Sequence, residues 1–189
     1  MKKIAILASG NGSNAENIIR HFQNHINVKT VLVGSNNNKA KVLKRVKKYK
    51  IPTLIFSKKD LNNTNLLTEL TKKKVDFIIL AGFLLKIPPH ILKIYTKKII
   101  NIHPSLLPLY GGKGMYGIHV HEKVVEHKKK ETGITIHFVN DKYDDGKIIF
   151  QAKCSLATNT TVKRVAKKVH ELEMKFYPKI IENILNENN

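Results

Sequence analysis

The sequence predicts an α/β protein with a Rossmann-like, doubly wound and mostly parallel sheet that ends in an antiparallel hairpin. Short apolar runs, typical of strands buried on both faces, alternate with stretches of helical periodicity through the first half of the chain. A glycine-containing turn joins the first apolar run to the first helix. Near the C-terminus, two strand-like segments flank a turn rich in Asp, which predicts the hairpin.

The elements follow one another in a regular order. Apolar runs in the first half predict strands at residues 4–8, 29–34, 53–56 and 75–82. Apolar residues at helical spacing predict helices at residues 14–25, 40–49, 60–73 and 88–95. In the second half we expect a strand from residue 99, a helix at 119–127, strands at 132–139 and 147–152, and a helix at 161–184. Residues 186–189 are expected to form a frayed tail.

The chain has 189 residues, which suffices for one domain with its own core over residues 1–189. No run approaches the roughly 18 apolar residues of a membrane-spanning helix. The N-terminus lacks the cleavage site of a signal peptide. Cys154 is the single cysteine, which excludes a disulfide framework and a cysteine metal cluster. We therefore expect a cytoplasmic protein with no membrane contact.

The net charge of +20 suggests a nucleic-acid partner. The residues that carry the charge argue against a nucleic-acid partner. Only Arg20, Arg45 and Arg164 are arginines, and the lysines are scattered along the chain. Readers of bases use arginine and aromatic side chains, and this chain has no Trp. We expect that no nucleic acid is required and that the charge attracts small anions. A basic RNA-binding module remains the alternative from another class of protein.

The turn at residues 9–14, Ser-Gly-Asn-Gly-Ser-Asn, predicts an anion site. A strand, a glycine turn and a helix in succession bring backbone N–H groups and a positive helix end together, which suits phosphate. Ser13 and Asn14 are cap residues that add side-chain donors. A tight turn without a ligand is the alternative. Residues 10–15 also fit the dinucleotide pattern, but no acidic residue follows the second strand, which favours a single phosphate over NAD.

The run from Ile99 to Pro108 ends a buried strand with two polar side chains. Asn101 and His103 are two residues apart and therefore point to the same face of a strand. Pro104 follows at once and ends the strand. Ligands of open α/β sheets bind outside the carboxyl ends of the strands. Asn101 and His103 are therefore candidate site residues; the alternative is that they satisfy backbone groups where the strand turns.

The second half adds two loops and a pair of histidines. The glycine-rich loop (residues 109–117) contains four glycines and is a candidate lid; the alternative is a surface excursion. His119 and His121 do not share a helix face, which argues against a zinc pair. The acidic loop (residues 140–146) contains three aspartates, of which Asp144 is the candidate site residue. An amide, an imidazole and a carboxylate suit direct attack of a substrate amine on a carbonyl.

Four motifs carry a resemblance that extends over essentially the whole chain. They are Gly-Asn-Gly-Ser-Asn at 10–14, Leu-Ala-Gly-Phe at 80–83, Asn-Ile-His-Pro-Ser-Leu-Leu-Pro at 101–108, and Thr-Ile-His-Phe-Val at 135–139 leading to Asp144. With these motifs the chain resembles the glycinamide ribonucleotide formyltransferases, which are folate-dependent enzymes of purine synthesis. Relatives with the same central motif include formyltetrahydrofolate hydrolases and tRNA formyltransferases. The N-terminal regulatory domain of the former and the C-terminal barrel of the latter are not expected in this chain.

The resemblance implies 10-formyltetrahydrofolate as the donor co-substrate, glycinamide ribonucleotide as the acceptor, no metal, and a monomer or homodimer. It implies a phosphate-binding half at about 1–100 and a catalytic half with the folate loop at about 101–189. The implied catalytic residues are Asn101, His103 and Asp144. The implied acceptor site holds phosphate with Gly12, Ser13 and Asn14, the ribose with Glu173, and the glycinamide with Gly117 and His119. The implied folate site consists of Phe83, Leu84, Leu85, Lys86, Ile87, Val139, Asn140, Asp141 and Asp144.

The chain also departs from the family pattern in three places. Leu84-Leu85-Lys86 differs from the commoner Met-Arg pattern, a change that backbone contacts to a pterin would survive. The segment 110–116 is longer than in the shortest relatives, so residue-by-residue transfer is weakest there. Asp145 stands where family members often have Gly after the catalytic Asp.

Overall fold

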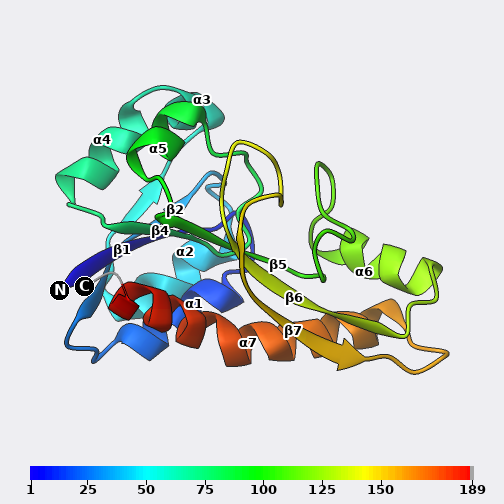
Figure 1. The fold of residues 1–189 in the computed structure, drawn as a ribbon. Helices are drawn as coiled ribbons and strands as arrows, with labels where there is room; N and C mark the ends of the chain where they lie inside the picture. Colours follow the sequence, from blue (N-terminus) through cyan, green and yellow to red (C-terminus); the bar gives the residue numbers. More distant parts are fainter. Residues whose placement is uncertain (188–189) are drawn as a thin grey trace.

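The computed structural model describes residues 1–187, which contain one seven-stranded sheet in the order β3-β2-β1-β4-β5-β6-β7 (Figure 1). The neighbours from β3 to β5 pair in parallel, whereas β6 pairs antiparallel with β5 and with β7. The predicted fold class and the hairpin are therefore confirmed. The strands are β1 (Lys2–Leu7), β2 (Val28–Ser35), β3 (Thr53–Ile55), β4 (Phe77–Leu80), β5 (Ile99–His103), β6 (Glu131–Phe138) and β7 (Ile148–Ser155).

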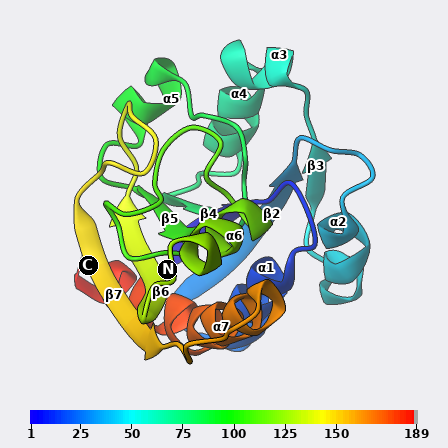
Figure 2. The same cartoon turned by 90° about the vertical axis from the view of Figure 1, so that its right-hand side faces the viewer.

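Helices cover both faces of the sheet (Figures 1 and 2). One layer contains α1 (Ser13–Phe22), α2 (Lys41–Val46) and α7 (Val162–Glu187), and the other contains α3 (Lys58–Asn62), α4 (Asn65–Lys72) and α5 (Pro89–Ile94). The helix α6 (Ile118–Glu126) follows the glycine-rich loop and contacts α7. The short 3₁₀ helix η1 (Lys47–Tyr49) continues α2. No helix within residues 1–187 is both long and apolar enough to cross a membrane.

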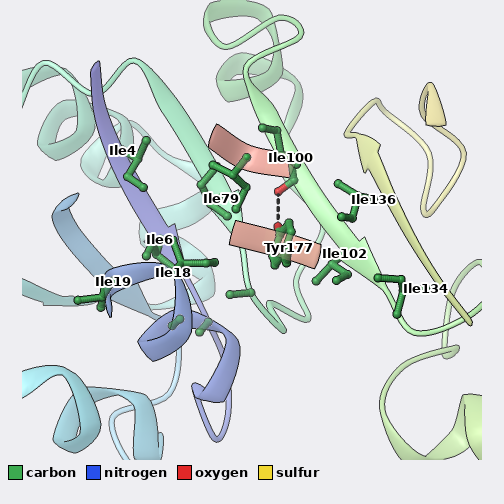
Figure 3. Close-up of a cluster of buried hydrophobic side chains, with 14 of the residues drawn as sticks. Ile4, Ile6, Ile18, Ile19, Ile79, Ile100, Ile102, Ile134, Ile136 and Tyr177 are labelled. Atoms are coloured by element: carbon green, nitrogen blue, oxygen red, sulfur yellow. Dashed lines mark hydrogen bonds between the residues drawn. The ribbon is translucent and has the colours of Figure 1, made fainter. Parts of the chain in front are cut away.

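Two apolar cores lie on opposite faces of the sheet because strand side chains alternate. Figure 3 shows the larger core, where isoleucines of β1, β4, β5 and β6 meet the helix α1 and the buried Tyr177 of α7. The Tyr177 hydroxyl donates toward the carbonyls of Leu80 and Ile100, at 2.9 and 3.2 Å. These carbonyls belong to β4 and β5, so Tyr177 fixes α7 against the strands that lead into the site.

The predicted helix at 60–73 is wrong, because two helices occupy this region. Ser57 and Asp60 form a reciprocal capping box that starts α3 early. Asn63 then has extended backbone dihedral angles, and its side-chain oxygen accepts from the N–H of Asn65, where α4 begins. Residues 62–65, Asn-Asn-Thr-Asn, are the sequence signal for this break.

The C-terminal helix is longer than predicted. It runs to Glu187, so residues 186 and 187 are helical and their assignment to a frayed tail is wrong. Residues 188–189 of the predicted tail lie outside the described residues.

Candidate functional site

A cavity of about 770 Å³ lies where the parallel strands end. Its wall includes Gly10 after β1, residues 82–84 after β4, and residues 101–104 at the end of β5. The glycine-rich loop, Asp144 and residues of α6 and α7 complete the wall. In both views the loop before α6 and the acidic loop rise from the same side of the sheet (Figures 1 and 2).

His103 is held on both sides of its ring. Its Nε2 donates to the carbonyl of Tyr110 at 2.7 Å, and its Nδ1 lies 3.5 Å from Asp144 Oδ2. A carbonyl only accepts hydrogen bonds, so Nε2 carries a hydrogen. The imidazole is 3% exposed, which leaves Nδ1 as the nitrogen that faces Asp144 at the cavity wall.

Asn101 is oriented by a residue that the sequence had not singled out as a site residue. His137, its register partner on β6, lies with Nε2 3.1 Å from Asn101 Nδ2. His137 Nδ1 lies 2.9 Å from the Phe138 carbonyl and must donate to it, so Nε2 accepts from the amide. Burial lowers the pKa of His137, which keeps this neutral form. The signal for His137 was the polar face of β6, where it alternates with apolar residues.

Asp144 reaches His103 because the acidic loop meets the glycine-rich loop. Asp144 has a left-handed backbone, with φ at +52°. The N–H of Gly112 donates to Asp144 Oδ2 at 3.0 Å, and Asp144 Oδ1 lies 3.7 Å from His137 Nε2. The structure thus brings Asn101, His103 and Asp144 together, and the glycine-rich loop contributes a backbone group that fixes the carboxylate.

Thr135 stabilises the turn that follows β5 by hydrogen bonds. Its buried hydroxyl donates to the Ser105 carbonyl at 2.7 Å and accepts from the N–H of Leu107 at 2.9 Å. Gln151 donates to the Thr135 hydroxyl and to the Leu107 carbonyl. Ser105 is 1% exposed and donates its own hydroxyl to the Leu109 carbonyl, so this serine belongs to the scaffold.

The turn at residues 9–14 leaves backbone donors unpaired. The first hydrogen bond of α1 runs from the Glu16 N–H to the Gly12 carbonyl, so the N–H groups before Glu16 have no partner in the helix. Gly12 has φ at +78°, and a Cβ there would lie 2.5 Å from Val42 Cβ. Arg45 of α2 donates to the backbone and side-chain oxygens of Asn11. The side-chain helix cap expected at this turn is not formed.

Glu173 lies beside this turn although it is far away in the chain. Its Oε2 accepts from Asn14 Nδ2 at 2.9 Å and lies 3.1 Å from His170 Nδ1. The hydrogen bond with Glu173 raises the pKa of His170. Asn14, His170 and Glu173 all line the cavity, whereas Gly12 and Ser13 do not. His170 precedes Glu173 by three residues on α7, which is the spacing that makes helical neighbours.

Most of the residues implied for folate line two cavities that share part of their walls. Phe83, Leu84 and Asp144 line the main cavity. A smaller cavity of about 60 Å³ shares Phe83, Asn101 and Asp144 with it and is also lined by Leu85, Lys86, Ile87, Val139 and Asn140. Asp141 lines neither space and instead borders a groove beside α5. Tyr143, which the sequence had not singled out, lines both.

The structure separates the two residues implied for the glycinamide. Gly117 lines the cavity and precedes α6. His119 does not line it: its side chain is 52% exposed and lies 3.3 Å from Glu122. His121, two residues further on, does line the cavity, and it is 7% exposed. Within residues 1–187 no three His, Cys, Asp or Glu side chains are grouped to hold a metal ion.

The site combines an amide, an imidazole and a carboxylate, a set that suits direct attack of an amine on a carbonyl. The chain matches the family model described as "Formyl transferase" over residues 2–181. It therefore belongs to the formyl transferase family.

Several known proteins are similar along nearly the whole chain. Phosphoribosylglycinamide formyltransferase of Bacillus subtilis is 35% identical over 195 residues, covering 100% of this chain and 97% of that protein. The chloroplastic enzyme of Arabidopsis thaliana is 38% identical over 193 residues, and this chain spans 98% of its own length but 66% of the plant protein's. The solved structure of phosphoribosylglycinamide formyltransferase from Anaplasma phagocytophilum has a TM-score of 0.89 and 33% identity, covering 98% of this chain and 87% of that one.

Proposed function

We propose that this protein transfers the formyl group of 10-formyltetrahydrofolate to the amine of glycinamide ribonucleotide. The observation that carries the proposal is one cavity wall that contains Asn101, His103 and Asp144 together with Asn14 and Glu173. The first three suit acyl transfer to an amine, and the last two border the turn with free N–H groups. The names of the relatives agree with this pair of substrates.

The reaction begins when the acceptor amine attacks the formyl carbon, forming a C–N bond and a tetrahedral oxyanion. One Asn101 amide hydrogen is engaged by His137, and the second is free to donate to this oxyanion. His103 has its Nε2 hydrogen engaged by the Tyr110 carbonyl, so its Nδ1 side is the one that exchanges a proton with the adduct.

Asp144 accepts the proton that the attacking amine loses, directly or through one water. The adduct then collapses, the bond from the formyl carbon to the folate nitrogen breaks, and Asp144 returns its proton, directly or through the same water, to that nitrogen as it leaves. The products are formylated acceptor and tetrahydrofolate, so atoms and charge balance. The Gly112 N–H bound to Asp144 Oδ2 holds the carboxylate in position through these steps.

The acceptor's phosphate and ribose select the substrate in this scheme. Phosphate binds the unpaired N–H groups at the start of α1, and Glu173 accepts hydrogen bonds from ribose hydroxyls with the carboxylate oxygen that Asn14 and His170 leave free. Phe83–Ile87 enclose the pterin of the donor together with Val139, Asn140 and Asp144, which line the same two spaces. The cytoplasmic location expected from the sequence suits these water-soluble substrates.

The deciding assay measures release of tetrahydrofolate from 10-formyltetrahydrofolate with and without glycinamide ribonucleotide. We expect release only with the acceptor, one formylated acceptor per tetrahydrofolate. Equal release without acceptor would identify a hydrolase instead. A matched acceptor that lacks the phosphate tests the anion site, and it should react with a KM at least tenfold higher.

A further inference from the structure

His121 is a buried polar residue at the cavity that the mechanism above does not use. It lies on α6, is 7% exposed, and lines the same cavity as His103. Its Nδ1 is buried and has no hydrogen-bond partner. Buried polar atoms without partners are rare in native structures, so this one requires an explanation. Since Nδ1 is buried, Nε2 is the ring nitrogen that can reach the cavity.

The sealed Nδ1 determines which hydrogen-bonding group His121 presents. A buried N–H without an acceptor costs more than a buried lone pair without a donor, so the hydrogen of the neutral ring belongs on Nε2. Burial lowers the pKa of His121; Glu173 opposes this shift, and the nearby His103 adds a smaller lowering. His121 therefore presents a neutral N–H donor to the cavity.

The position of the His121 N–H indicates which part of glycinamide ribonucleotide it contacts. His121 is close enough to Glu173 and to His103 for both to act on it electrostatically. In the proposed function, Glu173 holds the ribose and His103 borders the reacting amine. Between its ribose and its amine, glycinamide ribonucleotide carries one oxygen that accepts hydrogen bonds strongly, the carbonyl oxygen of its amide.

We propose that His121 recognises the acceptor by donating a hydrogen bond from Nε2 to the glycinamide carbonyl oxygen. This inference rests on the proposed function and adds a specificity-determining residue to it. The contact orients the chain between ribose and amine, so that the amine points toward Asn101 and His103. It also favours amides over acceptors that offer no oxygen at this point.

The test compares two variants. His121→Leu removes the N–H that donates the hydrogen bond, and His121→Gln replaces it with a side-chain amide that reaches the position of Nε2. Steady-state kinetics give kcat and both KM values. For His121→Leu we expect the acceptor KM to rise about tenfold, the factor that a single neutral hydrogen bond is worth, while the donor KM stays within twofold. His121→Gln should recover most of the loss. An acceptor with a thioamide, whose sulfur accepts weakly, should lose affinity for the wild type but not for His121→Leu.

Three outcomes would overturn the inference. An unchanged KM for the formyl acceptor in His121→Leu excludes the contact. If replacing the amide by the thioamide weakens binding equally in wild type and in His121→Leu, the carbonyl is not the group that His121 contacts. A larger rise for His119→Leu than for His121→Leu would assign the glycinamide to His119 instead. Failure of wild-type protein to formylate the acceptor at all refutes the proposed function and is recognised before any variant is made. The unchanged donor KM shows that the variants are folded.

Discussion

Asp144→Asn is expected to abolish most of the turnover while preserving the geometry of the site. Asp144 Oδ2 lies 3.5 Å from His103 Nδ1, and both side chains are largely buried, at 12% and 4% exposure. When His103 takes a proton during the reaction, its charge at that separation is attracted to the Asp144 carboxylate by about 5 kcal/mol at an effective dielectric constant of about 20. Each 1.36 kcal/mol of barrier corresponds to roughly a factor of ten in rate, so the charge accounts for about three decades in kcat.

The assay is the release of tetrahydrofolate at saturating concentrations of both substrates, with the donor KM measured alongside. Asp145→Asn is the matched control, because this neighbouring carboxylate is 53% exposed and pairs with Lys142 only at 3.9 Å. We expect Asp145→Asn to retain wild-type kcat, and Asp144→Asn to bind the donor within threefold of wild type. A kcat for Asp144→Asn within threefold of wild type would refute the role of the charge, as would an equal loss in both variants.

Three further predictions concern the scaffold around the site. Tyr177→Phe removes a hydroxyl bound to two strand carbonyls. It should lower the free energy of unfolding by about 1–2 kcal/mol and Tm by about 2–8 °C in calorimetry. Gly12→Ala introduces a Cβ 2.5 Å from Val42 at φ of +78°, and should raise the acceptor KM more than the donor KM; the reverse order contradicts the anion site. His170 has a raised pKa through Glu173, so its stabilising charge is complete below the ordinary imidazole pKa and is lost as pH rises through the raised value. The free energy of unfolding measured in urea should fall across that pH range for the wild type but not for His170→Gln.

Much of the fold was predictable because its signals are local. Continuous apolar runs predicted the parallel strands, and alternation predicted β6 and its hairpin with β7. The helix predicted at 60–73 failed for a local reason too: apolar residues at helical spacing lie on both sides of residues 62–65, but the short polar side chains between them satisfy backbone groups and stop the first helix. Periodicity alone does not detect such a competition.

The site was only partly predictable, because its residues meet through loops of no fixed geometry. The strand period put Asn101 and His103 on one face, as the structure has them. Helical spacing separated His119 from His121, but which of the two faces the cavity depends on how α6 packs against α7. The bond from the Gly112 N–H to Asp144 joins two loops, and no periodicity encodes such a contact.

The backbone at Asp144 provides a second test, which separates conformation from charge. Because β6 is antiparallel to β5, the acidic loop must fold back over the strand end to bring Asp144 to His103, and it does so with φ at +52°. Asp and Asn tolerate this left-handed conformation, whereas other non-glycine residues pay about 1–2 kcal/mol. Both variants lose the carboxylate charge, but only Asp144→Ala adds this conformational cost, so it should be roughly 1 kcal/mol less stable than Asp144→Asn in urea unfolding. Equal stabilities of the two variants would show that the conformation of this residue does not constrain the loop.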